Sequence, residues 1–335
     1  MAIHIMSFTD ATIVGISFPH SMMDAGGLAT LLAEWSAVVN CRPSNKVRPL
    51  AGARKDIVGE IIKKLHVKST MQNNSLVQEA GKVYEKQPQN KPDRVLNTDL
   101  RLIFIPKNFL LNVRKIDERL RKRSFLEDDA FDISDAEVLM AWVTRSMCLW
   151  RSKSSLEEIP VWLRTTLNLR DPKYEYCNPD EAYVQNLRCQ AATQLSVFQI
   201  GKYTIGETAR LIRTSLRTQT RSFIQAKLKL WRDTYIGGTP DLFGFKDNAT
   251  LEIEDFTPAR LYEAVNFKNA VAPGYSRHAT AGSCVFYHTL PPKRYRGRRE
   301  LFYIYGQDLE GNFWLAGYME PKAWDMIERE LHSWK

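Results

Sequence analysis

The sequence predicts a mixed α/β (α+β) fold, in which a mixed sheet carries helices on its faces. Short apolar runs with the two-residue period of strands alternate along the chain with longer runs of helical spacing. Two helix starts are marked locally, because Ser134 and Thr204 are each followed three residues later by Glu, the pattern of a capping box. The strands and helices interleave without a repeat, which favours helices packed on a sheet.

Three elements are expected before residue 40. Apolar and β-branched residues predict strands over 2–8 and 11–18, the second of them largely buried. Pro19 ends the second strand, because proline has no backbone donor for the ladder. Leucine, valine and tryptophan at helical spacing then predict an amphipathic helix over 24–39.

A polar, lysine-rich stretch over 42–98 follows, and its composition suits a linker with at most one short helix, around 57–65. Beyond it, residues 101–105 form a strand candidate that Pro106 ends. An amphipathic helix comes next, with apolar residues from Phe109 to Leu120 on one face and basic residues on the other. Such a basic run is more often a solvated face than a ligand site.

The alternation continues through the second half of the chain. We expect one helix from the capping box at Ser134 and a long one from Thr204 to about Trp231. Pro321 suits the first turn of a terminal helix. Strands are expected over 162–170, 182–196, 283–289, 301–305 and 313–318.

Composition excludes few functions. A length of 335 residues suggests about two domains, and 44% hydrophobic with 25% charged residues is ordinary for globular proteins. The net charge of +9, from 47 basic and 38 acidic residues, favours an anionic partner. Nucleic acid is not expected, since the sequence has no zinc-finger spacing, no RNA-binding aromatic signature and no long basic helix.

The five cysteines form no C-x-x-C pair, and their odd number points to reduced thiols inside the cell. No apolar run reaches the ~18 residues that would span a bilayer, and the first residues lack the pattern of a signal peptide. These features predict a soluble, cytoplasmic protein with no membrane partner.

The segment from His20 to Gly26 carries the clearest chemical signal. His20 lies at a strand end just before a helix start, where side chains project into crevices. A neutral imidazole there can take a proton from a hydroxyl and return it to a leaving group. The alternatives are a hydrogen-bonded structural His20 and an Asp24 that merely caps the helix. A metal site lacks a third ligand, and without a G-x-S-x-G elbow Ser21 is better interpreted as a loop hydroxyl.

The pattern His-x-x-x-Asp-x-Gly, preceded by V-G-I-S-F-P and followed by L-x-x-L-L-x-x-W, resembles the signature of the BAHD-type acyl-CoA-dependent acyltransferases, especially their fungal branch. Residues 133–142 look like the helix that opens the second domain of that family. The run Leu167-Asn-Leu-Arg170 and the run Tyr183-Val-Gln-Asn186 are similar to two later family elements, in the same order. The family's D-F-G-W-G element has no clear counterpart between Val265 and Gly282.

The resemblance implies a mixed-sheet sandwich with the two-domain architecture of chloramphenicol acetyltransferase. Family members carry a block of strands and helices before the His motif, so we expect an incomplete first domain and hypothesise a shortened product or gene model. The implied organisation is a remnant of the N-terminal domain at 1–41, a crossover linker at 42–98 and a C-terminal domain at 99–335.

The resemblance also implies a mechanism. His20 acts as general base on an alcohol that attacks acyl-CoA, the co-substrate, in a tunnel between the domains, and no permanent cofactor or metal is required. Asp24 turns away from the reacting atoms and pairs with Arg170, and Gly26 supports the same loop. Tyr183 and Asn186 line the tunnel by analogy, although a strand Tyr and Asn that satisfy backbone groups would explain them equally well.

Further expectations follow from the resemblance. The expected reaction is O-acyl transfer to a small molecule of fungal secondary metabolism, with acetyl as the expected acyl group. The enzyme is expected to be a monomer. The basic cluster at 293–299 either meets the phosphates of coenzyme A or is a solvated turn. Two other functions stay open: a catalytically silent relative that binds a ligand or partner, and an amide-forming condensation domain, which usually has a His where this chain has Pro19.

Overall fold

The structure is a computed structural model. It describes residues 1–41, 43, 46–51, 56–63, 98–123, 133–149, 160–234, 249–272, 274, 280–290 and 300–333. Among these residues, no helix is both long and apolar enough to cross a bilayer. Most of the expected linker and the basic cluster at 293–299 lie outside the described residues.

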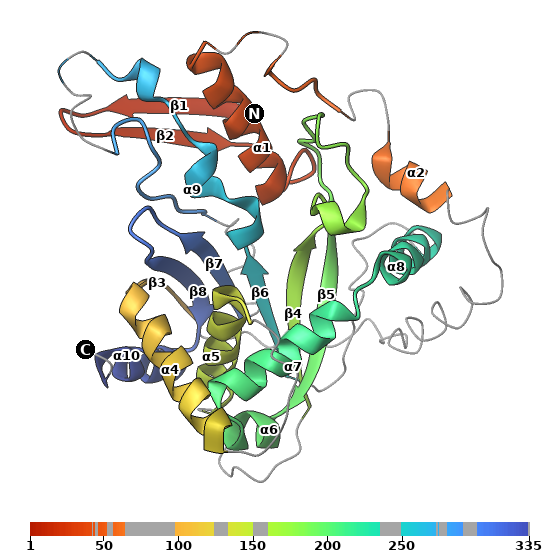
Figure 1. Ribbon diagram of the computed structural model, residues 1–335, viewed down its shortest axis with the longest axis vertical. Coiled ribbons are helices and arrows are strands. Elements are labelled where there is room, and N and C mark those ends of the chain that lie inside the picture. The colour runs from red at the N-terminus through yellow and green to blue at the C-terminus, as the bar shows by residue number, and fades with distance from the viewer. Residues whose placement is uncertain are drawn as a thin grey trace. The chain divides into compact units, whose positions relative to one another are not determined.

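Two compact units make up the chain, and neither is continuous in sequence (Figure 1). The domains expected from the sequence are each one continuous stretch of chain. The two units instead each combine segments that are far apart along the chain. The first unit comprises residues 1–60, 168–188 and 256–288, and the second comprises residues 61–167, 189–255 and 289–335.

A six-stranded mixed sheet forms the frame of the second unit, with the strand order β3-β8-β7-β6-β4-β5. Strand β8 pairs antiparallel with β3 and β7, whereas β6 runs parallel to both β7 and β4. This arrangement confirms the predicted mixed sheet. The strands are β3 (Asp99–Ile105), β4 (Pro160–Asn168), β5 (Arg188–Ser196), β6 (Ala249–Asp255), β7 (Leu301–Gln307) and β8 (Phe313–Met319).

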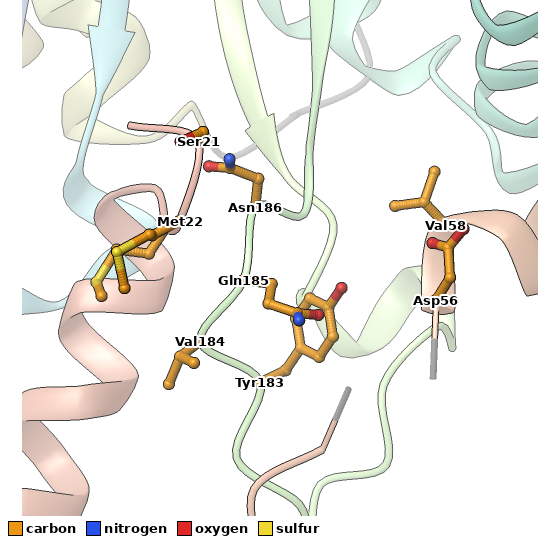
Figure 2. A pocket seen from close by; sticks show the side chains of 9 residues that line it. Ser21, Met22, Asp56, Val58, Tyr183, Val184, Gln185 and Asn186 are labelled. Carbon is orange, nitrogen blue, oxygen red and sulfur yellow. The ribbon is translucent and has the colours of Figure 1, made fainter. Parts of the chain in front are cut away.

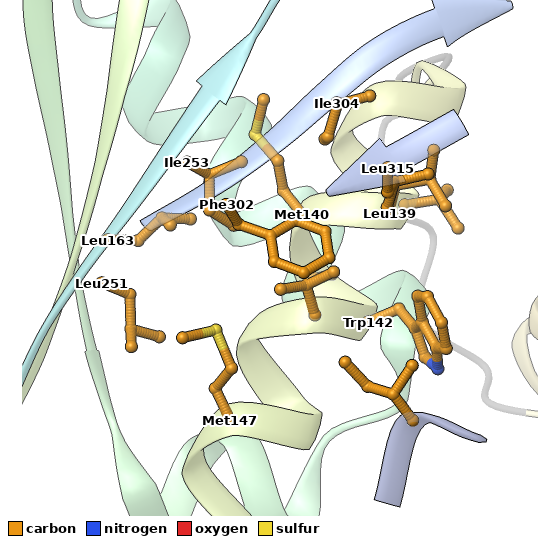
Figure 3. Close-up of a cluster of buried hydrophobic side chains, with 14 of the residues drawn as sticks. Leu139, Met140, Trp142, Met147, Leu163, Leu251, Ile253, Phe302, Ile304 and Leu315 are labelled. Carbon is orange, nitrogen blue, oxygen red and sulfur yellow. The ribbon is translucent and has the colours of Figure 1, made fainter. Parts of the chain in front are cut away.

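The core of this unit lies between one face of the sheet and α5 (Asp135–Leu149) (Figure 3). Alternate residues of the strands point to this helix, because successive side chains of a strand face opposite ways. The indole of Trp142 is fully buried, and its Nε1 donates to Glu330 Oε2 at 2.8 Å, so the burial leaves no unmet donor. The side chains that meet here include Leu139, Met140, Trp142, Met147, Leu163, Leu251, Ile253, Phe302, Ile304 and Leu315.

Local capping sets where several helices begin. Both predicted capping boxes are present: the Ser134 hydroxyl accepts from the Glu137 N–H, and Thr204 and Glu207 make the same reciprocal pair. A third box, at Ser196 and Gln199, starts α6 and is absent from the sequence prediction. The helices of this unit are α4 (Lys107–Arg123), α5, α6 (Val197–Lys202), α7 (Ile205–Arg217), α8 (Arg221–Thr234) and α10 (Pro321–Ser333).

The helix predicted from Thr204 to Trp231 is in fact two helices, α7 and α8. Thr218 caps the end of α7, and the Thr220 hydroxyl accepts from the Phe223 N–H at 3.3 Å, which starts α8. Threonine hydroxyls compete for backbone groups in this way, so two threonines within three residues favour a break.

Two strand predictions also need correction, and one strand was missed. Residues 182–187 form no strand: Ala182 makes only an isolated bridge, to Leu50, and the carbonyls of Tyr183, Gln185 and Leu187 accept from the Arg170 side chain. Residues 283–289 form no strand, and only Ser283 makes an isolated bridge, to Asn266. Strand β6 was not predicted, since Glu252 and Glu254 interrupt its apolar pattern, yet Leu251 and Ile253 between them are fully buried.

The first unit consists of a hairpin, helix α1 and shorter segments. Strands β1 and β2 pair antiparallel, with Ile3 opposite Ile16. Strand β2 is exposed to half-buried, which corrects the prediction of a buried strand, because within the described residues it pairs with β1 alone. The helices and strands here are β1 (Ala2–Ser7), β2 (Thr12–Ser17), α1 (Ala25–Val39), the 3-10 turns at Pro172–Tyr174, Thr257–Ala259 and Lys268–Ala270, and α9 (Leu261–Ala264); α2 (Ile57–Lys63) crosses from this unit into the second.

Helix α1 is attached to residues 261–267 of the same unit. Leu32 and Ala29 pack against Leu261, and the Ser36 hydroxyl donates to the Ala264 carbonyl at 3.0 Å and accepts from the Asn266 N–H at 2.9 Å. These contacts fix the position of α1 within the unit. They therefore also fix the residues at the N-terminus of the helix.

The Phe302 side chain tests the core of the second unit. It is fully buried between the sheet and α5, so Phe302→Ala should lower the free energy of unfolding by about 3–5 kcal/mol, measured by denaturant titration. The matched control is Phe104→Ala, since Phe104 is 43% exposed and should lose about 1 kcal/mol or less. Equal losses in the two variants would contradict this placement of the core.

Candidate active site

His20 lies on the turn that joins β2 to α1. The turn closes with a hydrogen bond from the Met22 N–H to the Pro19 carbonyl at 2.9 Å, and the residue itself is exposed. The carbonyl of His20 accepts from Asn186 Nδ2 at 2.8 Å. The backbone at His20 is thus anchored, while the residue remains accessible from solution.

The Asp24 carboxylate does more than cap α1. Its Oδ1 accepts from the Gly27 N–H at 2.8 Å, which is the expected N-cap bond. Its Oδ2 accepts from the Leu187 N–H, also at 2.8 Å. One carboxylate therefore joins the start of α1 to the loop 183–187.

Arg170 completes the environment of this carboxylate. Its Nη2 lies 3.0 Å from Asp24 Oδ1 and its Nη1 lies 3.3 Å from Oδ2, with side chains that are 12% and 8% exposed. The two-point pair expected between Asp24 and Arg170 is formed, the geometry that a planar guanidinium favours. The alternative, in which Asp24 is a helix cap exposed to water, is wrong because the carboxylate is buried.

The same guanidinium also holds the loop 183–187. Arg170 Nε donates to the Tyr183 carbonyl at 2.9 Å, Nη2 donates to the Gln185 carbonyl, and the guanidinium carbon lies 5.5 Å from the centre of the Tyr183 ring. Arg170 Nη1 also donates to Asn168 Oδ1 at 3.1 Å. This loop also contains Asn186, whose side chain donates to the His20 carbonyl. Arg170 therefore helps to position the His20 turn indirectly, through the loop.

Two glycines allow these segments to approach α1. A Cβ on Gly26 would lie 2.7 Å from Arg170 Nη1, and a Cβ on Gly27 would lie 1.9 Å from the Val184 carbonyl oxygen. Gly26 was expected to support the site, whereas Gly27 was missed. The tandem of glycines at a helix start was the available signal, because glycine is unfavourable there unless the backbone approaches closely.

A cavity of about 490 Å³ lies beside the His20 turn (Figure 2). The predicted tunnel residues Tyr183 and Asn186 both line it, whereas His20 itself is not among the lining residues and its neighbour Ser21 is. The lining residues are Ser21, Met22, Met23, Asp56, Val58, Tyr183, Val184, Gln185 and Asn186.

Burial raises the pKa of Tyr183, and the nearby Arg170 charge opposes that rise. Burial likewise raises the pKa of the Cys177 and Cys189 thiols, and it raises the pKa of Cys284 to about 11. The Tyr183 hydroxyl is therefore protonated near neutral pH and can donate a hydrogen bond. These three thiols are poor nucleophiles, since the thiolate is the reactive form.

Among the residues that the structure describes, no group of three or more His, Cys, Asp or Glu side chains is placed to hold a metal ion.

A family model described as Transferase matches residues 1–242, which is more than half of the chain. The chain belongs to the Transferase family. This is the family of the BAHD-type acyltransferases, so the resemblance carried by the His20 motif is confirmed.

Curated relatives of this Transferase family member come from fungi. The O-acetyltransferase PaAT-2 of Phomopsis amygdali is 26% identical over 360 residues, which cover 99% of this chain and 70% of the relative. The acetyltransferase BOT5 of Botryotinia fuckeliana is 26% identical over 374 residues, which cover 100% of this chain and 66% of the relative.

Solved structures of the same fold are also found. TRI101 of F. graminearum, in complex with ethyl coenzyme A, superposes with a TM-score of 0.64 at 14% identity. The match covers 95% of this chain and 64% of TRI101. The chain thus spans about two thirds of the length of the proteins it matches, and at this identity the structural likeness shows the fold alone.

The contact between Gly27 and Val184 yields a test of how α1 meets the loop. Alanine in place of glycine within a helix normally stabilises by about 1 kcal/mol, but here a Cβ would collide with backbone. Gly27→Ala should therefore lower the midpoint of thermal unfolding. Gly26→Ala is the matched comparison and should lower it less, since its Cβ meets the end of the Arg170 side chain. A Gly27→Ala protein more stable than wild type would contradict the contact.

The Asp24 pair yields a second test. Asp24→Ala leaves a buried guanidinium without its carboxylate and should lower the free energy of unfolding by about 3–5 kcal/mol in denaturant titration. Asp24→Asn keeps one oxygen that can cap the helix but removes the charge, so it should recover only part of the loss. A loss of about 1 kcal/mol for Asp24→Ala would mean that Asp24 is an ordinary helix cap.

Proposed function

We propose that this chain is an O-acyltransferase of fungal secondary metabolism. It transfers an acyl group, with acetyl as the expected one, from acyl-CoA to a hydroxyl of a small molecule. The observation that carries the proposal is the anchored His20 turn. A buried ion pair and a hydrogen bond from the Asn186 side chain to the His20 carbonyl hold the turn in place, and His20 remains exposed next to a cavity. A general base needs this combination of fixed position and access.

In the proposed reaction, the His20 imidazole accepts the proton of the acceptor hydroxyl as its oxygen attacks the thioester carbonyl carbon. A C–O bond forms, and the tetrahedral oxyanion collapses with cleavage of the C–S bond. The imidazolium then returns the proton to the coenzyme A thiolate, so that atoms and charge balance. A thioester is already activated, and no acyl-enzyme is required.

The remaining site residues have supporting roles in this proposal. Asp24, Gly26 and Arg170 position the turn, because they form the contact that joins α1 to the loop 183–187. Asn186 lines the cavity and also holds the His20 carbonyl. Tyr183 lines the cavity and stacks on the Arg170 guanidinium.

The relatives support the acyl donor and the acceptor class. PaAT-2 is named an O-acetyltransferase, and structures of TRI101 hold coenzyme A together with T-2 or deoxynivalenol. On that basis we propose acyl-CoA as the acyl donor of this chain and a small alcohol as its acceptor. The five free cysteines support a cytoplasmic location, and the monomeric state remains a prediction from the sequence.

The test of this function is release of free thiol from acetyl-CoA and other acyl-CoAs in the presence of a panel of alcohols. His20→Ala should reduce turnover by about 10²–10⁴ without lowering the thermal midpoint, since the residue is exposed and the lost group acts in proton transfer. His332→Ala, which removes an exposed histidine of α10, should retain wild-type turnover. Equal turnover by His20→Ala and wild type would show that His20 is not the base.

A further inference from the structure

Strands β1 and β2 form a hairpin whose side chains are largely apolar and exposed (Figure 1). All six residues of β1 are exposed, whereas Val14 and Ile16 of β2 are half-buried. Isolated exposed apolar residues are ordinary, but a contiguous group of them marks an interaction surface. The large apolar side chains of this group are between 41% and 58% exposed, and they belong to Met1, Ile3, Ile5, Met6, Phe8 and Ile13.

The register of the hairpin places four β-branched side chains on one face. Ile3 lies opposite Ile16 and Ile5 lies opposite Val14, and opposite residues of antiparallel strands share a face. Ile16 packs against the apolar cluster that includes Leu32 of α1, which accounts for its partial burial. The two isoleucines of β1 are thus the uncovered half of this apolar face.

Strand β1 is also an unprotected edge. Among the described residues it pairs with β2 alone, so its outer side takes no part in a strand ladder. Proteins usually protect such an edge with a charged side chain or a proline, and the β1 sequence Ala-Ile-His-Ile-Met-Ser contains no Lys, Arg, Asp, Glu or Pro. A sheet of two strands is only marginally stable in water. Both features favour the addition of a strand at β1.

The charge of the hairpin favours a second copy of this chain as the source of that strand. The whole chain has a net charge of +9, which opposes contact between two copies over most of their surfaces. Between Met1 and Phe18, however, Asp10 is the single Lys, Arg, Asp or Glu, and it lies in the turn between the strands. Two hairpins can therefore meet without opposing like charges, whereas a charged partner protein finds no complementary charge on this surface.

We propose that β1 pairs antiparallel with β1 of a second copy, so that the two hairpins form one four-stranded sheet. With the two-fold axis at His4, each Ile3 lies opposite Ile5 of the other copy, and each Ala2 lies opposite Met6. This register unites the isoleucines of both copies on one apolar face. The contact is isologous and closed, which gives a dimer in place of the monomer expected from the resemblance. It does not depend on the proposed catalytic function.

Sedimentation velocity of the full chain at increasing protein concentration tests the dimer. Wild-type protein should shift from monomer to dimer as the concentration rises. Ile5→Lys should raise the dissociation constant at least about tenfold, because it places two uncompensated charges on the shared face of each dimer. Val38→Lys is the matched control, since Val38 is an exposed apolar residue of α1 in the same unit, and it should leave the constant unchanged. The thermal midpoint of each variant reports whether it is folded.

A cysteine at the two-fold axis tests the register and does not require the lysine variants. In a Cys41→Ser background, which removes an exposed native thiol, His4→Cys should form a disulfide between two copies under mild oxidation. Opposite residues of paired strands bring their Cβ atoms within about 5.5 Å, close to the spacing of a disulfide. Thr12→Cys in the same background is the control, because Thr12 lies on the outer strand of the proposed sheet, and it should form no such link.

Each outcome decides the proposal. Wild-type protein that stays monomeric at every concentration would overturn it, and so would a dimer that Val38→Lys weakens and Ile5→Lys does not. A dimer without a disulfide in His4→Cys, or with an equal yield in Thr12→Cys, would overturn the antiparallel pairing of β1. None of these results bears on acyl transfer, which the release of free thiol measures independently.

Discussion

The Asp24 carboxylate is the point on which the candidate site depends. Its two oxygens accept from the Gly27 N–H, the Leu187 N–H and the Arg170 guanidinium. It therefore connects the first turn of α1 with a loop that is 163 residues away along the chain. A buried ion pair adds little net stability relative to a well-packed apolar pair, so its physical value here is in fixing geometry.

That geometry extends to His20 through a short series of contacts. Arg170 holds three carbonyls of the loop 183–187, and Asn186 in the same loop donates to the His20 carbonyl. Gly26 and Gly27 allow the guanidinium and the loop to lie close to the helix. The histidine is thus positioned by its backbone, and its exposure leaves the imidazole accessible to a substrate. The cavity formed by the same loop lies alongside.

Much of this could be predicted from the sequence, where the controlling interactions are local. The capping boxes at Ser134 and Thr204 use residues only three positions apart, and the β7–β8 pair is likewise local in sequence. The Asp24 and Arg170 pair came from the family resemblance, since no periodicity or spacing connects residues 146 positions apart.

Several errors share a physical cause, because they depend on contacts that are distant in sequence, whereas the break between α7 and α8 and the box that starts α6 are local. The apolar run after Ala182 looks like a strand, but its carbonyls bind Arg170, which the local pattern cannot reveal. Gly27 is required by the backbone of Val184, and a sequence gives no sign of which carbonyl approaches a helix. Strand β2 looks buried from its composition, yet burial depends on how many strands and helices cover it.

Hydrogen exchange at two backbone amides tests the role of the Asp24 carboxylate most directly. The Gly27 and Leu187 N–H groups donate to the two oxygens of that carboxylate, so both should be protected and should open with the same free energy. Replacing Arg170 by Met should accelerate exchange at both amides together. Exchange of Leu187 at the rate of an open loop, with Gly27 still protected, would contradict the account, because the carboxylate would then cap α1 without holding the loop.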